Sequence, residues 1–265
     1  MIGANGGWRP KLVALDVDGT VLDHDGSLPY EVAAVVRAVA ASGIRVVLAT
    51  GRSWHGTLPV VERLGLAGGP SVCSNGAVVV DFPPERIVKA VTFDPRTVIQ
   101  KVATDAPGTL VAVEEIGRGY RLSGPFPAGD LTGEMLIEDL EQLSSRPVTR
   151  IILRDPARSD NDFLALAKRL GLHGVQYYVG YSAWLDIAPA GVTKAAGLED
   201  VVRELGISAA DVLAVGDGRN DVEMLEWAGR GVAMGQAPIE VQRIADAVTG
   251  SYADRGLVAE LRRWL

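Results

Sequence analysis

The sequence has little cysteine and no long apolar segment. Its one cysteine, Cys73, excludes an internal disulfide and favours a reducing compartment. No run of 18 apolar residues is present, and residues 1–10 lack the apolar core of a signal peptide. We therefore expect a cytoplasmic protein with no membrane partner, in which Cys73 is a buried structural thiol at the end of a strand.

Positive charge is also scarce, because 26 lysines and arginines stand against 33 acids and give a net charge of −7. This balance argues against nucleic acid as a partner, since broad phosphate binding needs a basic surface. No GxxxxGK[ST] loop occurs, and residues 216–218 (GDG) lack the third glycine of a dinucleotide fingerprint. An anionic substrate must therefore be held by a few local cations or by a metal.

What the sequence does contain is an alternation of short apolar runs with helical patterns at both ends of the chain. The expected strands are 11–16, 44–49, 70–73, 212–215 and 231–234. The expected helices are one that starts at Ser27–Pro29, then 54–64, 193–205, 220–228 and 238–245. Continuous apolar strands separated by helices predict an α/β fold with a Rossmann-like, doubly wound parallel sheet.

The middle of the chain has a different order. A hairpin is expected at 77–93, around Phe82-Pro83-Pro84. Helices are expected at 95–105, 130–143 and 161–170, and strands at 109–115, 120–123, 149–154, 175–179 and 184–187. Helices beside strands of this kind predict an α+β module inserted into the parallel one. We place the core domain at 1–81 plus 188–265 and the inserted domain at 82–187.

Acidic and hydroxyl side chains follow the first two expected strands. Asp16 and Asp18 lie in a DxDG loop after the first strand, and Thr50-Gly51 follows the second. Ligands of an open parallel sheet bind beyond the carboxyl ends of its strands. One carboxylate can attack while the other handles protons, with a divalent cation between them. The alternative for each motif alone is a polar turn or a helix cap.

Two later motifs complete the set. Lys194 begins a helix, where a cation opposes the macrodipole, which mildly disfavours a purely structural role. Such a cation could neutralise a phosphate and the aspartate beside it, and a surface lysine is the alternative for this residue alone. Asp217, Asn220 and Asp221 lie in a glycine-rich loop after a later strand, with a spacing that suits metal ligation by oxygen. In this order the motifs supply a nucleophile, an acid/base, phosphate ligands and a metal site.

These four ordered motifs resemble those of the haloacid dehalogenase-like hydrolases. Further matches are typical of the Cof-type branch, whose type IIB cap domain is inserted after the third strand. They are Ser74-Asn75-Gly76-Ala77, 188–198 (APAGVTKAAGL), 220–225 (NDVEML), 231–235 (GVAMG) and 254–258 (DRGLV). The resemblance covers roughly 11–81 and 186–260, and the cap matches in size and position only.

The resemblance implies a role for each matched residue. Asp16 would be the nucleophile and a magnesium ligand, and Asp18 the acid/base that also lends its backbone carbonyl to the metal. Thr50 and Gly51 would hold the phosphoryl oxygens, with Lys194 bridging the phosphate and Asp16. Asp217 would be a direct metal ligand. Asp221 and Asn220 would support the metal or the phosphate. The cofactor would be Mg²⁺.

Other polar residues carry weaker expectations. His24, His55 and His173 share no ligand spacing, and a surface role is expected for His24. Arg52 either sets its loop or reaches phosphate. The cap residues Glu114, Arg118, Tyr120 and Arg154 could meet a substrate, but a solvated surface is the favoured interpretation. Trp184 is expected in a hinge or in core packing.

The function predicted is magnesium-dependent hydrolysis of a small phosphorylated metabolite, such as a sugar phosphate, through an aspartyl phosphate. Three alternatives stay open. A phosphomutase or phosphotransferase would return the phosphoryl group to a hydroxyl on the same core. A receiver domain would store phosphate on an aspartate, although it needs neither Asp18 nor an inserted domain. A non-catalytic, phosphate-responsive regulatory protein would retain only the fold. The substrate and the oligomeric state do not follow from the sequence.

Overall fold

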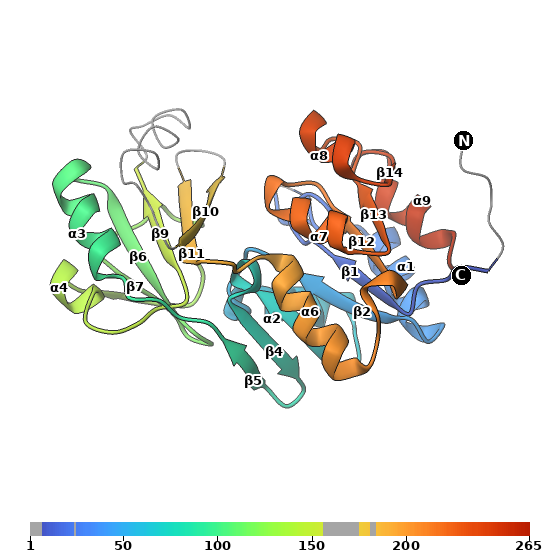
Figure 1. The fold of residues 1–265 in the computed structure, drawn as a ribbon, viewed down its shortest axis with the longest axis horizontal. Helices are drawn as coiled ribbons and strands as arrows, with labels where there is room; N and C mark the ends of the chain where they lie inside the picture. Colours follow the sequence, from blue (N-terminus) through green and yellow to red (C-terminus); the bar gives the residue numbers. More distant parts are fainter. Residues whose placement is uncertain (1–6, 24, 156–174, 181–183) are drawn as a thin grey trace.

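The computed structural model describes residues 7–23, 25–155, 175–180 and 184–265, and the strands in these ranges form two sheets (Figure 1). The larger sheet has the order β14-β13-β12-β1-β2-β3-β4-β5. Its strands are β1 (Leu12–Leu15), β2 (Arg45–Ala49), β3 (Gly69–Cys73), β4 (Val78–Phe82), β5 (Arg86–Ala90), β12 (Val212–Gly216), β13 (Arg230–Ala233) and β14 (Ala247–Val248). Strands β1, β2, β3, β12, β13 and β14 run parallel, so their carboxyl ends share one edge.

Helices cover both faces of this larger sheet. Because alternate residues of a strand face opposite sides, Val13 and Leu15 contribute to one core cluster, and Leu12 and Ala14 to another. The first cluster includes α1 (Tyr30–Ala41), α2 (Trp54–Leu64) and α9 (Gly256–Arg262). The second includes α6 (Lys194–Leu205), α7 (Val222–Trp227) and α8 (Ile239–Ile244). This three-layer arrangement confirms the predicted α/β fold class.

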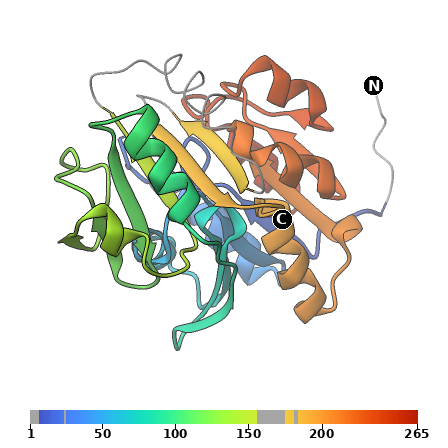
Figure 2. The same cartoon turned by 60° about the vertical axis from the view of Figure 1, so that its left-hand side comes forward.

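The smaller sheet has the order β10-β11-β9-β6-β7-β8. Its strands are β6 (Leu110–Glu115), β7 (Gly119–Leu122), β8 (Glu134–Ile137), β9 (Ile151–Arg154), β10 (Val175–Gly180) and β11 (Trp184–Pro189). Figure 2 shows α3 (Arg96–Asp105) lying across one face of it. The apolar residues of α3 and of the short α4 (Leu140–Leu143) pack there on Val111, Val113 and Ile151. The other face carries Ala112, Glu114 and Tyr120.

Three expectations about elements differ from the structure. Residues 130–143 are not one helix, because β8 pairs parallel with β7 at the sheet edge and only α4 is helical. Gly133, with a φ of +99°, interrupts the helical pattern. Strand β5, which we expected in the inserted domain, pairs with β4 in the larger sheet. Strand β14 and helix α9 were not expected at all.

The remaining expected elements lie where the sequence predicts them, with ends that agree within three residues, wherever the structure describes them. The helix expected at 161–170 falls outside the described residues. The domain boundaries at 81/82 and 187/188 stay a prediction, although the division of strands between the sheets favours a first boundary after Ala90. Among the described helices, none has the length and apolar character needed to cross a bilayer.

Candidate active site

Side chains from distant parts of the chain meet at the carboxyl edge of the larger sheet. Asp16 follows β1, Thr50 follows β2 and Asp217 follows β12, while Lys194 is the first residue of α6. From β1 the strand order extends through β2 and β3 on one side and through β12 and β13 on the other. The carboxyl ends of the neighbouring strands β1 and β12 therefore mark the topological switch point, where ligands of such sheets bind.

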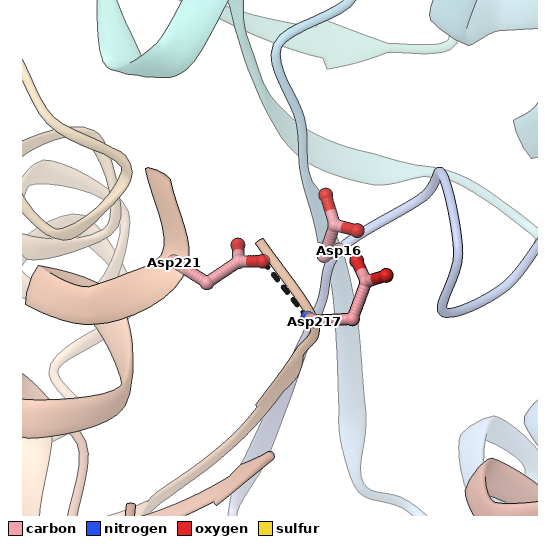
Figure 3. Close-up of side chains that lie close together, drawn as sticks. All are labelled: Asp16, Asp217 and Asp221. Atoms are coloured by element: carbon pink, nitrogen blue, oxygen red, sulfur yellow. Dashed lines mark hydrogen bonds between the residues drawn. The ribbon is translucent and has the colours of Figure 1, made fainter. Parts of the chain in front are cut away.

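Three carboxylates cluster at this switch point. One oxygen from each of Asp16, Asp217 and Asp221 lies within 4.8 Å of the others. Asp16 and Asp221 are buried and Asp217 is half-buried. Figure 3 shows the carboxylates of Asp16 and Asp217 side by side, with Asp221 directed at the backbone nitrogen of Asp217. A hard divalent cation prefers such oxygen donors, so this donor set fits one.

Lys194 supplies positive charge within the cluster. It is 0% exposed, and its Nζ donates to Asp16 Oδ1 at 2.6 Å and to Asp221 Oδ1 at 2.7 Å. Thr193 caps α6 by accepting from the Ala196 amide, which fixes the helix start that carries the lysine. Burial disfavours the charge of Lys194, but attraction to the two aspartates outweighs it and raises the pKa of the lysine.

Burial and neighbouring acids disfavour the charged form of Asp16, the predicted nucleophile. The pKa of Asp16 is raised well above its usual value, first by burial and then by repulsion from Asp221, with Lys194 opposing the shift. Without further positive charge, the ionised form of Asp16 is therefore disfavoured. A cation beside Asp217 would stabilise the carboxylate that a nucleophile needs, which is a second reason why the donor set fits a metal.

The two oxygens of Asp221 are already engaged. Its Oδ1 accepts from Lys194, and its Oδ2 accepts from the amides of Asp217 and Gly218 at 3.0 and 2.8 Å. These bonds shape the loop that carries Asp217. Within the cluster, Asp221 thus supports the lysine and the loop, whereas Asp16 and Asp217 face each other.

Asp18 lies apart from the three-carboxylate cluster. Its side chain is about half exposed and forms a bidentate ion pair with Arg52, at 2.5 Å to Nη2 and 2.8 Å to Nε. The sequence left the role of Arg52 open between loop setting and phosphate binding. In the structure Arg52 joins the loop after β1 to the loop after β2, so it sets the position of Asp18.

The Thr50-Gly51 loop, which is predicted to bind phosphate, is held by hydrogen bonds within the loop and to the turn that contains Asn75. The hydroxyl of the buried Thr50 accepts from the Arg52 amide at 3.1 Å, and the Thr50 carbonyl accepts from the Asn75 amide at 3.0 Å. Asn75 Oδ1 in turn accepts from Asn220 Nδ2 at 2.9 Å. Asn75 thereby joins the Thr50-Gly51 loop to the loop of Asp217.

Sequence reasoning missed one residue of the site. Gln236, in the loop after β13, donates to the Gly19 carbonyl at 2.7 Å and to Asp217 Oδ2 at 3.2 Å. It follows a parallel strand at the same sheet edge as Asp16, and that position was the available signal. Gly19 has a φ of +85°, and a Cβ there would lie 2.2 Å from Asp217 Oδ2, so only glycine lets the two loops approach this closely.

The solvated surface expected for four cap residues is wrong for three of them, and only Arg118 is exposed. Glu114 and Tyr120 are both 4% exposed. Arg118 is exposed and pairs with Glu134, as expected, and Arg154 is largely covered and pairs with Asp130. Cys73 is a buried thiol beside Thr57, and burial raises its pKa to about 12, in agreement with a structural role.

The fold and the site together define an α/β protein with a lysine-bridged cluster of carboxylates at the sheet switch point. The family model for the haloacid dehalogenase-like hydrolases matches residues 13–261. A phosphoglycolate phosphatase from Natronomonas pharaonis is 31% identical, over 93% of this chain and 95% of its own. An HMP-PP phosphatase from Serratia proteamaculans is 28% identical, over 96% and 95%.

Among solved structures, the subclass IIB sugar phosphatase BT4131 shares the fold with a TM-score of 0.81, at 21% identity over 96% of this chain and 98% of that one. The chain belongs to the haloacid dehalogenase-like hydrolase family, and its structural neighbours include the predicted Cof-type, IIB-capped phosphatases. The prediction of a phosphoric monoester hydrolase is confirmed.

Proposed function

We propose that the protein is a magnesium-dependent phosphatase that hydrolyses a small phosphorylated metabolite, such as a sugar phosphate, through an aspartyl phosphate on Asp16. One observation carries this proposal: Lys194 is buried between Asp16 and Asp221, while Asp217 lies beside Asp16. This arrangement brings a nucleophile, a cation and a pair of metal-binding carboxylates into one place, as phosphoryl transfer requires.

In the first step, an oxygen of Asp16 attacks phosphorus and the bond to the leaving alcohol breaks. Asp18 donates a proton to that alcohol after its carboxyl group leaves Arg52 and turns inward. Thr50, Gly51 and Asn220 hold the phosphoryl oxygens, and Lys194 offsets the charge shared by the phosphate and Asp16. In the second step, Asp18 takes a proton from water, which attacks phosphorus and frees Asp16.

Asp16, Asp217 and the backbone carbonyl of Asp18 would hold the magnesium ion, with Asp221 supporting Asp217. When bound, the ion would neutralise charge on Asp16 and on the phosphoryl oxygens. Asp221 is less suited to direct ligation, because both of its oxygens accept hydrogen bonds from the protein. A site of two side-chain carboxylates that also needs substrate phosphate is typical of Mg²⁺.

Two observations support a small substrate. The smaller sheet contacts the turn Ser74–Gly76, which is bonded to the Thr50-Gly51 loop of the site. The hydroxyl of Ser74 donates to Glu114 of β6 at 2.6 Å. A domain seated this closely favours small molecules over phosphoproteins. The named relatives are phosphatases of phosphoglycolate and HMP-PP, which supports a phosphorylated metabolite without naming it. A phosphomutase has the same core chemistry, and free phosphate release without a bisphosphate activator would decide against it.

The test is a panel of small phosphate esters assayed for phosphate release with Mg²⁺. We expect turnover of at least one ester, loss of turnover on chelation with EDTA, and recovery when Mg²⁺ is restored. Asp16→Asn is the matched control, because it keeps the shape of the side chain and removes the attacking oxyanion. Turnover that survives Asp16→Asn or EDTA would contradict the proposal.

A further inference from the structure

Two consecutive residues beside the site adopt a left-handed backbone conformation. Ser74 has a φ of +51° and Asn75 a φ of +54°, in the turn Ser74–Gly76 that follows β3. Residues other than glycine rarely adopt this conformation, although asparagine tolerates it better than serine. Strain of this kind persists where the surroundings impose it, and it concentrates at functional sites.

This turn supports the loop predicted to bind phosphate. The Ser74 amide donates to the Arg52 carbonyl at 2.8 Å, and the Asn75 amide donates to the Thr50 carbonyl at 3.0 Å. Both donors depend on the left-handed conformation, because it directs successive N–H groups to one side. If Ser74 returned to an ordinary conformation, the carbonyls of Thr50 and Arg52 would lose these partners and the loop would shift.

What holds Ser74 comes from the other sheet. Glu114 of β6 is 4% exposed, and its Oε2 accepts from Ser74 Oγ at 2.6 Å and from Thr149 Oγ1 at 3.2 Å. Burial raises the pKa of Glu114, while Arg150 and the two hydroxyls oppose the shift. Ser74 belongs to the predicted core domain and Glu114 to the predicted inserted domain, so this bond joins the two.

The neighbouring residue is held from the same side. Asn75 Nδ2 donates to Asp186 Oδ2 of β11 at 3.3 Å, and Asp186 forms a buried, bidentate ion pair with Arg150 at 2.5 and 2.6 Å. The side-chain amide of Asn75 is therefore bonded at both of its polar atoms: Nδ2 donates to Asp186, and Oδ1 accepts from Asn220. Both left-handed residues thus have a side-chain partner in the smaller sheet.

We infer that Glu114 is a positioning residue for phosphoryl transfer: through Ser74 it holds the left-handed turn that sets the Thr50–Arg52 loop. The inference rests on the proposed function for the reaction that it serves. The contact between the two sheets therefore also affects the Thr50–Arg52 loop, because the turn Ser74–Gly76 supports that loop fully only while β6 lies against the turn. Glu114 itself needs no contact with substrate.

The test compares three variants with the wild-type protein. Ser74→Ala removes the bond to Glu114 and leaves the strain, whereas Ser74→Gly removes the bond and relieves the strain. Thr149→Val is the matched control, since it removes the other hydroxyl bonded to the same carboxylate without touching the turn. Each is assayed with Mg²⁺ on p-nitrophenyl phosphate and on the best ester of the panel, and its folding is checked by thermal unfolding.

We expect Ser74→Ala to lower kcat by about 10- to 100-fold with a smaller change in KM, because a misplaced loop costs turnover more than binding. Ser74→Gly should recover most of that loss, and Thr149→Val should stay close to wild type. A role in stability alone would lower the melting temperature of Ser74→Ala and of Thr149→Val alike without separating their kcat values. Equal kcat values for Ser74→Ala and Thr149→Val, or no recovery in Ser74→Gly, would overturn the inference.

A second measurement does not depend on activity. Amide hydrogen exchange at Ser74 and Asn75 reports the bonds to Arg52 and Thr50 directly. We expect faster exchange at both amides in Ser74→Ala than in Thr149→Val. Unchanged exchange in Ser74→Ala would overturn the inference even in an active enzyme. If the wild-type protein hydrolyses no ester, but Ser74→Ala still exchanges faster than Thr149→Val at both amides, the proposed function is overturned and the role of Glu114 in holding the turn stays supported.

Discussion

At the scale of single residues, Lys194 determines whether the acidic cluster can exist inside the protein. Burying two carboxylates is costly unless a cation compensates them, and Lys194 bonds to both Asp16 and Asp221. The same contacts raise the pKa of the lysine, so it stays charged over the whole range in which the acids titrate. The lysine is therefore a structural group, in addition to the catalytic role that we propose for it.

Lys194→Gln should destabilise the protein by about 3–5 kcal/mol near neutral pH, because it leaves buried carboxylates without their partner. The pKa of Asp16, already raised, should rise further in this variant. Its folded form then binds protons that the unfolded form has released, so the loss of stability should shrink as the pH falls towards the unfolded pKa. Urea unfolding at pH 8 and pH 5 measures both effects.

Lys11→Gln is the control for that experiment, since the pair of Lys11 with Asp211 is largely exposed and contributes little. A Lys194→Gln variant as stable as Lys11→Gln, or one whose deficit is the same at both pH values, would contradict the account of the cluster.

At the scale of elements, the site depends on how closely the turn after β3 approaches the start of α6. Gly76 has a φ of +102°, and a Cβ there would lie 2.0 Å from the Thr193 carbonyl oxygen. Gly197, one turn into α6, would place its Cβ 2.5 Å from Val72 of β3. Glycine at both positions lets α6 lie against β3, and this contact brings Lys194 to Asp16.

Gly76→Ala should therefore be more destabilising than Gly206→Ala. Both glycines have a positive φ, so each alanine adds about 1–2 kcal/mol of backbone strain. A Cβ at Gly206 meets nothing within 4 Å, whereas the one at Gly76 meets backbone of Thr193 and Lys194. Thermal unfolding of the two variants, with the phosphatase rate of each, measures the difference. Equal losses would show that close approach at Gly76 is unimportant.

The elements also show what sequence patterns can and cannot predict. Buried strands such as β1 and β12 are continuous apolar runs with every residue covered, and they were predicted closely. Strand β8 was not predicted, because it is an exposed edge strand whose Met135 and Leu136 continue a helix-like spacing from Leu131. Its pairing with β7 holds it as a strand, and pairing between segments is not a local property.

At the scale of the whole molecule, the predicted site residues come together because three of the motifs follow strands of one parallel sheet and Lys194 begins a helix that packs on it. The contact between the two sheets could not be predicted from motifs that follow strands. Glu114, Arg150 and Asp186 are polar and widely spaced, so the sequence favoured a solvated surface for Glu114. Their burial follows from the pairing of β6, β9 and β11, which brings the three side chains together against Ser74 and Asn75.

Arg150→Met should destabilise the protein by about 3–5 kcal/mol, because it leaves the Asp186 carboxylate buried without its partner. The double variant Arg150→Met with Asp186→Asn should recover much of this loss, since a neutral amide keeps the shape and can still accept from Asn75. Urea unfolding of the single and double variants measures the coupling. If the stability losses of Arg150→Met and Asp186→Asn simply add in the double variant, Arg150 does not compensate the charge of Asp186 at this contact.

The proposed mechanism requires Asp16 to carry the phosphoryl group during turnover. The most direct measurement is to quench the reacting enzyme rapidly with acid, reduce it with borohydride and map its peptides by mass spectrometry. An acyl phosphate on Asp16 is reduced to an alcohol, so we predict homoserine at position 16, dependent on substrate and Mg²⁺. An enzyme that turns over with no modification at position 16, or with modification of another acid instead, would contradict it.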